Sequence, residues 1–219
     1  SALASPPQSS DPTNSHTFAV LTTAEMSPTP RFSTTSSLDV VGIGNAIVDV
    51  LVQTEDQFLS DHNLSKGSMA LVDEDQAKSL YDASGPGLET SGGSAANTLA
   101  GLAQLGSKAG FIGRVRDDQL GSIFTHDIQS VGTRFETPAA VSGASTARCL
   151  ILVTSDAERT MCTYLGASTQ LDPDDLDLSM VRDTKVLYLE GYLWDSPAAK
   201  KAFITAAEAC RESGGQVAL

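Results

Sequence analysis

Apolar, β-rich runs alternate with amphipathic helical segments along most of this chain, and that alternation constrains its fold. The first run, residues 38–44 (LDVVGIG), has the near-continuous apolar character of a strand buried on both faces, and it ends in a glycine turn. Further strands are predicted at 68–72, 109–115, 186–189 and 216–219, and helices at 57–63, 74–84, 95–105, 118–131 and 197–213. This order predicts an α/β fold with a largely parallel sheet.

The alternation is interrupted by two consecutive β-rich runs. Residues 146–154 and 159–165 flank the short polar turn 155–158, which predicts a β-hairpin. After the hairpin, Asp172 and Pro173 have the residue types of a helix N-cap and first helical position. We expect a helix to begin there, with the acidic side chains of Asp174, Asp175 and Asp177 in a solvated first turn rather than at a metal site.

Composition excludes several classes of function. The net charge of −13 and the 5% aromatic content argue against a nucleic-acid partner. The three cysteines, widely spaced and odd in number, indicate a reduced protein of the cytoplasm. No apolar run approaches the length of about 18 residues that a membrane span requires, so we expect no membrane partner.

The two ends of the chain have contrasting character. Residues 1–37 are rich in Ser, Thr and Pro and are predicted to be a disordered tail. A plastid-type transit peptide and a true start at Met26 are the two readings left open for it. At the other end, residues 216–219 begin a buried strand, so we expect the folded region, 38–219, to be incomplete at its C-terminus.

A glycine-rich segment precedes one of the predicted helices. Gly92 and Gly93 are flanked by small residues, and Asn97 follows in the early helix. Paired glycines at a helix N-terminus let backbone amides approach an oxygen-rich ligand such as a polyol or a ribose. A tight loop that simply enters a packed helix is the alternative explanation. The segment 42–47 begins like a dinucleotide fingerprint but has Ile47 in place of its third glycine, which disfavours a nicotinamide dehydrogenase.

Together, four segments resemble the ribokinase (PfkB) family of carbohydrate and nucleoside kinases, most closely its adenosine-kinase-type members. They are GIGNAIVD at 42–49, GGSAAN at 92–97, FIGRVRDDQLG at 111–121 and RTM at 159–161. The resemblance covers residues 38–219. It implies a mostly parallel sheet flanked by helices, with a small β-sheet lid drawn from the region of Ser68 and from the hairpin at 148–165.

The resemblance also implies a set of substrate-binding residues. Asp49 accepts hydrogen bonds from sugar hydroxyls, Gly92, Gly93 and Asn97 hold the same ring, and Asn45 lies beside them. Asp49 as a strand-end carboxylate and Asn45 as a turn residue are the alternatives. Met161 faces the base or aglycone, Arg159 the closing site, and Tyr192 stacks on a base; packing or surface roles remain the alternatives for these three.

Members of the family that this sequence resembles transfer the γ-phosphoryl group of ATP, with Mg²⁺, to a substrate hydroxyl. A Gly-Ala-Gly-Asp motif supplies the base, and an Asn-x-x-Glu motif is linked to Mg²⁺ and phosphate. This sequence contains neither, so we expect the catalytic aspartate beyond Leu219 and a chain that is inactive alone. An adenosine-like nucleoside is the expected substrate. A fructose- or ribose-type sugar kinase, or a non-catalytic binding protein of the same fold, remains the alternative. The chain is expected to be either a monomer or a lid-mediated homodimer.

Overall fold

The computed structural model of the protein describes residues 37–219. The disordered tail predicted for residues 1–37 lies outside the described residues, apart from Ser37. Where the structure describes the chain, no helix combines the length and the apolar character that crossing a membrane requires. Cys149, Cys162 and Cys210 are buried and free.

The predicted parallel sheet is confirmed, and we call it sheet A. Its strands run in the order β10-β9-β1-β5-β6, and every neighbouring pair is parallel. The bounds are β1 (Leu38–Ile43), β5 (Ala109–Ile112), β6 (Arg134–Phe135), β9 (Thr184–Leu189) and β10 (Gln216–Ala218). Because the strands are apolar on both sides, both faces of the sheet need helices to cover them.

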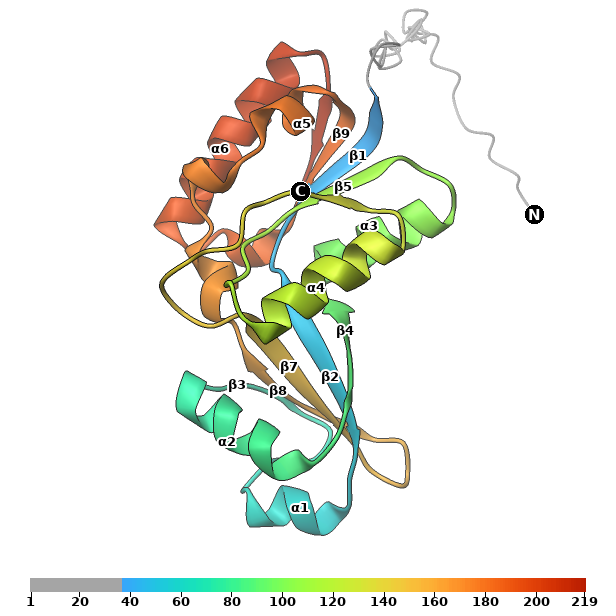
Figure 1. Ribbon diagram of the computed structural model, residues 1–219, viewed down its shortest axis with the longest axis vertical. Coiled ribbons are helices and arrows are strands. Elements are labelled where there is room, and N and C mark those ends of the chain that lie inside the picture. Colours follow the sequence, from blue (N-terminus) through green and yellow to red (C-terminus); the bar gives the residue numbers. More distant parts are fainter. Residues whose placement is uncertain (1–36) are drawn as a thin grey trace, which may run out of the picture. The chain divides into compact units, whose positions relative to one another are not determined.

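Helices cover both faces of sheet A (Figure 1). They are α3 (Ser94–Gln104) and α4 (Gln119–Ser130) on one side and α5 (Leu178–Arg182) and α6 (Pro197–Glu212) on the other. Side chains alternate along β1, so that Val41 and Ile43 pack with α5 and α6 while Val40 packs with Leu99 of α3. Asp118 caps α4 by accepting a hydrogen bond from the Gly121 amide at 2.8 Å.

A second sheet, called sheet B, contains the predicted hairpin. Its order is β3-β8-β7-β2-β4, with bounds β2 (Ile47–Gln53), β3 (Met69–Leu71), β4 (Leu88–Gly92), β7 (Ala147–Val153) and β8 (Arg159–Tyr164). Strands β7 and β8 are antiparallel, as predicted. The sheet is larger than the sequence suggested, because β2 joins β7 in parallel and β4 joins β2 in antiparallel orientation.

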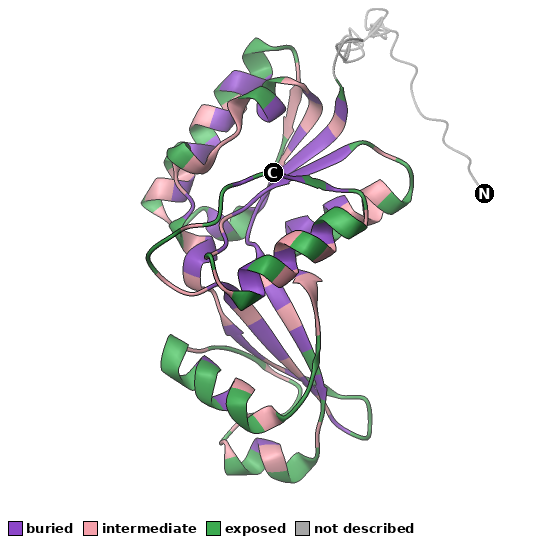
Figure 2. Ribbon diagram, in the orientation of Figure 1, coloured by how far each residue is buried: buried purple, intermediate pink, exposed green. Residues whose placement is uncertain are grey.

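Buried and less buried residues alternate along much of the strands of sheet B (Figure 2), because its two faces differ in burial. Val48, Val50 and Val52 of β2 point to one face and are buried in a core shared with α4, α1 (Asp56–Asp61) and α2 (Glu74–Ser84). The opposite face leaves large apolar side chains exposed, namely Leu51, Met69, Leu71 and Leu88. Sheet B therefore has one structural face and one open face, and Asp49 belongs to the open face.

The prediction of a helix beginning at Asp172 was wrong. Pro173–Asp175 forms a single 3₁₀ turn, and α5 begins later, capped by Asp177, which accepts from the Ser179 and Met180 amides. The other 3₁₀ turns are Gly166–Gln170 and Gly191–Leu193. The acidic turn is not fully solvated either, because Arg114 lies 2.8 Å from the Asp175 carboxylate and their side chains are only 20% and 13% exposed.

We expect Asp175→Ala to lower the free energy of unfolding by about 1–2 kcal/mol, because it removes a largely buried ion pair and one half of a capping box. The neighbouring Asp174 is exposed, so Asp174→Ala is expected to stay within about 0.5 kcal/mol of the wild type. Urea unfolding of both variants measures the difference. Equal midpoints for the two variants would show that the Arg114 pair contributes nothing.

Candidate functional site

The chain leaves sheet A and enters sheet B through a sharp corner at Gly44, Asn45 and Ala46. Asn45 is buried there, and its side chain is bonded on both sides. Its Nδ2 donates to Glu190 Oε2 at 2.8 Å, and its Oδ1 accepts from Ser168 Oγ at 2.8 Å. Both ends of the Asn45 side-chain amide therefore form hydrogen bonds within the protein, and these bonds stabilise the corner.

Glu190 joins three elements at this corner. It follows β9 directly and is only 2% exposed. Its carboxylate accepts from the Asn45 amide at 2.6 Å and from the Ala95 amide near the N-terminus of α3 at 3.0 Å. The backbone amide of Ala95, one of the α3 amides expected to bind an oxygen-rich ligand, is thus bonded to Glu190 instead. The sequence offered a signal for this residue, an acidic side chain directly after a buried strand.

The two glycines have different places in the structure. Gly92 is the last residue of β4, whereas Gly93 is the N-cap of α3 with φ +100° and ψ 144°. A Cβ on Gly93 would lie 2.4 Å from the Asn45 carbonyl oxygen. Glycine is therefore required here both for the backbone conformation and for the close approach of two backbones.

The Asp49 carboxylate lies against Gly92, where a Cβ would come within 2.3 Å of the carboxylate carbon. Asp49 is half-buried, and no hydrogen-bond donor from residues 37–219 reaches its side chain. Burial raises the pKa of the Asp49 carboxyl to about 6. An acceptor-only group held this way, without donors of its own, is suited to accept hydrogen bonds from a ligand's hydroxyls.

The row of side chains across sheet B at Asp49 is polar on β4, β2, β7 and β8 and ends at the apolar Leu71 on β3. Asp49 is in register with Thr90 on β4 and Cys149 on β7, and Cys149 is in register with Thr163 on β8. The Thr163 hydroxyl donates to Cys149 Sγ at 3.2 Å. Burial raises the pKa of the Cys149 thiol to about 11, so it stays protonated at neutral pH. Neither Cys149 nor Thr163 was predicted beside Asp49.

The next row on the same face is apolar. Leu51, Ile151, Met161 and Met69 are in register on β2, β7, β8 and β3. Met161 is the one predicted residue in this row, and it is half-buried. Polar and apolar groups thus lie next to each other on the open face of sheet B, two residues apart along β4, β2, β7 and β8.

The other predicted residues lie on three separate elements. Asn97 is exposed on α3, beyond Gly93. Tyr192 is 81% exposed and follows Glu190 at the carboxyl end of β9. Arg159 begins β8 in register with Val153, four residues along the sheet from the row of Asp49. At about 3.3 Å per residue this is roughly 13 Å, too far for a shared contact in this conformation.

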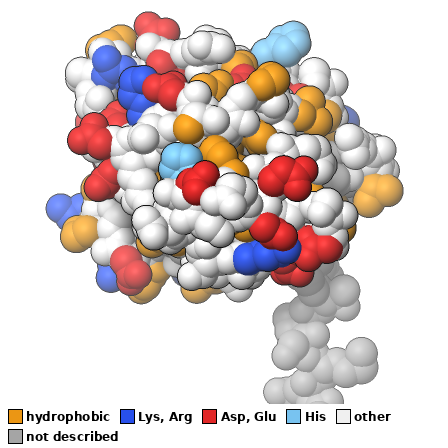
Figure 3. Space-filling view, turned by 90° about the horizontal axis from the view of Figure 1, so that it is seen from below, with side chains coloured by type: hydrophobic (Ala, Val, Ile, Leu, Met, Phe, Trp, Pro, Cys, Tyr) orange, Lys and Arg blue, Asp and Glu red, His pale blue; other side chains and the backbone are white. Residues whose placement is uncertain are grey.

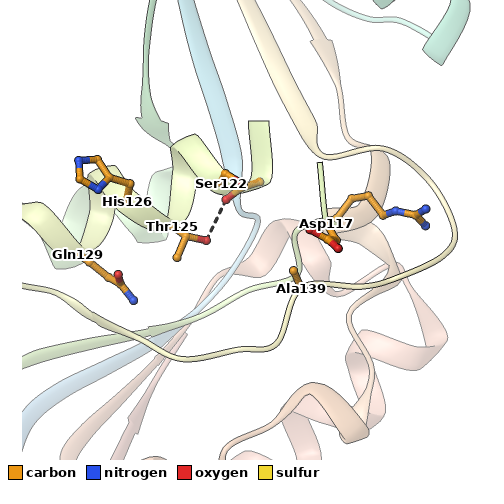
Figure 4. Close-up of a pocket in the computed structure, with 8 residues that line it drawn as sticks. Asp117, Ser122, Thr125, His126, Gln129 and Ala139 are labelled. Carbon is orange, nitrogen blue, oxygen red and sulfur yellow. Dashed lines mark hydrogen bonds between the residues drawn. The ribbon is translucent and has the colours of Figure 1, made fainter. Parts of the chain in front are cut away.

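Helix α4 has pockets that contain none of the predicted residues. One, of about 310 Å³, is lined by Ser122, Thr125, His126 and Gln129 of the helix and by Asp117 and Ala139 across from it (Figure 4). A second, of about 550 Å³, is lined by Glu89, Asp127 and other residues. On the surface at the end of the molecule that contains α1 and α2, acidic and hydrophobic side chains are interspersed with polar, uncharged ones (Figure 3).

Within residues 37–219, no group of three or more His, Cys, Asp or Glu side chains is arranged to hold a metal ion. Asp49 supplies a hydrogen-bond acceptor and the first turn of α3 supplies backbone amide donors, and together these groups are suited to an uncharged, hydroxyl-bearing ligand.

Comparison with known proteins finds sugar kinases and adenosine kinases that are similar to this chain. A probable sugar kinase from Rhizobium etli is 48% identical with a TM-score of 0.74, covering 83% of this chain and 55% of its own. The adenosine kinase of Sinorhizobium meliloti is 48% identical with a TM-score of 0.73, covering 82% and 55%. The probable fructokinase-2 of Arabidopsis thaliana is 29% identical over 160 residues, 69% of this chain and 47% of its own.

The chain thus spans about half the length of these relatives. The family model described as pfkB family carbohydrate kinase matches residues 72–218, which is most of the part that the structure describes. The same stretch holds the Gly92–Gly93 segment, helix α3 and the hairpin of β7 and β8. The protein belongs to the pfkB family of carbohydrate kinases.

Proposed function

We propose that this chain binds the hydroxyl-bearing substrate of a pfkB-type kinase, between the open face of sheet B and the N-terminus of α3. The observation that carries the proposal is the Asp49 carboxylate, which is half-buried against Gly92 and has no donor from residues 37–219. Vicinal hydroxyls of a sugar ring supply such donors, and a hydrogen bond to a charged acceptor is about twice as strong as a neutral one.

In this proposal the remaining residues orient the same ligand. The Gly93 backbone and Asn97 contact the ring from the helix side, while Asn45 and Glu190 keep the corner in place. Met161 and the apolar row contact the part of the ligand that carries no hydroxyls. Tyr192 is exposed at the carboxyl end of β9, the edge at which α/β sheets bind ligands, and is free to stack on a planar group.

The proposed substrate is a nucleoside of the adenosine type. A nucleoside combines a ribose, which matches Asp49, with an apolar planar base, which matches the row of Leu51, Ile151 and Met161. One of the similar solved structures is described as an adenosine kinase. A sugar such as fructose is the second candidate, because other relatives are described as fructokinases and a sugar kinase.

We further propose that the substrate hydroxyl is phosphorylated with ATP in the presence of Mg²⁺. ATP supplies the phosphoryl group, and the residues of this chain bind and orient the hydroxyl that accepts it. Residues 1–219 contain no Gly-Ala-Gly-Asp motif for the base. We therefore expect the chain to bind the substrate without turnover.

Isothermal titration of the 219-residue chain with adenosine, fructose and ribose tests the proposal. We expect adenosine to bind and the bare sugars to bind more weakly, with no phosphorylated product formed when ATP and Mg²⁺ are added. Tighter binding of fructose than of adenosine would reverse the order of the two substrates. Binding of none of the three would contradict the proposed role of Asp49.

A further inference from the structure

Helix α4 is joined to the substrate segment by a contact that the resemblance did not point to. Asp127 of α4 accepts two hydrogen bonds at the same oxygen, Oδ2, both from Ser91. The Ser91 amide donates at 2.7 Å, and the Ser91 hydroxyl donates at 2.7 Å. Ser91 directly precedes Gly92, so this contact restrains the end of β4 that leads into the glycine segment.

The helix end of this contact is firmly anchored in the core. Phe124 and Ile128, which flank Asp127 in α4, are fully buried. The Phe124 ring packs at 5.3 Å from Phe135 and 5.9 Å from Phe111, measured between ring centroids. Asp127 therefore extends from a part of the molecule with little freedom to move.

The strand end of the contact is less restrained. Strand β4 lies at the edge of sheet B and pairs only with β2 among the described strands. Its side chains are polar or exposed, apart from the buried Gly92, so apolar packing contributes little to its position. A charged acceptor that binds both the amide and the hydroxyl of Ser91 is consequently a strong restraint on this end of β4.

We infer that Asp127 and Ser91 are positioning residues that hold Gly92 and Gly93 at the correct distance from Asp49 for ligand binding. Gly92 lies in contact with the Asp49 carboxylate, and Gly93 leads into α3, so a small shift of β4 changes the spacing between the two sides of the site. Asp127 itself does not face the ligand. It acts through Ser91, from a helix on the opposite side of β4.

The inference rests on the proposed function only for its binding readout, and a second readout is independent of any ligand. In the full chain, we expect Asp127→Ala to weaken adenosine binding about tenfold. We also expect it to accelerate hydrogen–deuterium exchange of the amides at 91–96. Asp127→Asn keeps an acceptor and Ser91→Ala keeps the amide bond, so both are expected to lie between Asp127→Ala and the wild type.

Gln129→Ala is the matched control, because Gln129 is on the same helix and its side chain bonds away from β4. This variant loses one hydrogen bond, which Gln129 Nε2 donates to the Phe135 carbonyl at 2.7 Å. It is expected to leave both readouts at the wild-type level. Wild-type affinity and wild-type exchange at 91–96 in Asp127→Ala overturn the inference. If the wild type binds no ligand, the proposed function fails while the exchange data still decide. If Asp127→Ala does not fold, Asp127→Asn and Ser91→Ala decide.

Discussion

Replacing Asp49 by asparagine is expected to weaken ligand binding and, at the same time, to stabilise the free protein at neutral pH. Both effects follow from a half-buried carboxylate that no donor from residues 37–219 reaches. Loss of its charge removes the strong hydrogen bonds to the ligand's hydroxyls, which we expect to cost about 2–3 kcal/mol of binding free energy. The same loss relieves the free protein of an unpaired, partly buried charge.

The sign of the pH dependence follows from the raised pKa. Burial raises the pKa of Asp49 from 3.8 to about 6, so the folded protein holds this proton more tightly than the unfolded chain does. Stability therefore falls as the pH rises from about 4 to about 6 and stays lower above that range. Since part of the carboxyl remains in contact with water, we expect Asp49→Asn to recover about 1–2 kcal/mol at pH above 7.

Ligand binding is expected to have the opposite pH dependence. Hydroxyl donors favour the ionised carboxylate, so affinity should rise between about pH 5 and about pH 7 and should become independent of pH in Asp49→Asn. Titration in buffers of different ionisation enthalpy should detect a proton released on binding. Asp75→Asn, on the exposed side of α2, removes the same charge and should change neither property. An Asp49→Asn variant that binds like the wild type, or that is less stable at pH 8, would contradict this assignment.

The elements predicted correctly are those whose signals are local. The strands of sheet A other than β6, which was not predicted, are apolar runs, and the helices α2 and α4 have caps at Asp73 and Asp118 that can be recognised from a few residues. The hairpin of β7 and β8 was also recognisable, because its two runs are joined by a short polar turn. In each case one stretch of sequence contains the information that determines the element.

The elements that were missed depend on partners far away in the sequence. Strand β4 (LETSG) has no apolar alternation, and its geometry comes from antiparallel pairing with β2. Instead of the helix predicted at Asp172, the structure has one 3₁₀ turn, and α5 follows it with its own cap at Asp177. The side chain of Asp175 in this turn pairs with Arg114. Propensity alone does not show such long-range pairs.

The candidate site shows the same division. Gly92 and Gly93 were singled out from their pattern and Asp49 from the family resemblance, but the contact between Asp49 and Gly92 requires β2 and β4 to lie side by side. The resemblance implied that Asn45 lies beside the ligand, which stays a prediction; in the structure both ends of its side-chain amide are bonded to Glu190 and Ser168. Glu190 has one signal, its place directly after a buried strand, but neither Glu190 nor Asp127 could be assigned a role, because an isolated acid in a sequence has many ordinary explanations.

Replacing Gly93 by alanine is expected to destabilise the fold strongly. The backbone of Gly93, at φ +100° and ψ 144°, is in a region that residues with a side chain rarely adopt. The new Cβ would lie 2.4 Å from the Asn45 carbonyl oxygen, and a backbone atom held by the corner between two sheets cannot rotate away. We expect a loss of at least about 3 kcal/mol in the free energy of unfolding, measured by urea denaturation.

Alanine variants at two other glycines distinguish the clash at Gly93 from a general effect of adding a methyl group. Gly101 lies within α3, where a Cβ would meet no atom within 4 Å, so Gly101→Ala should stabilise the protein by about 0.5–1 kcal/mol. Gly92→Ala would instead press on the Asp49 carboxylate, a side-chain end that can move, so its main loss should be in ligand binding rather than in stability. Similar stabilities for the alanine variants at Gly93 and Gly101 would show that the close approach of Gly93 to Asn45 does not restrain the fold.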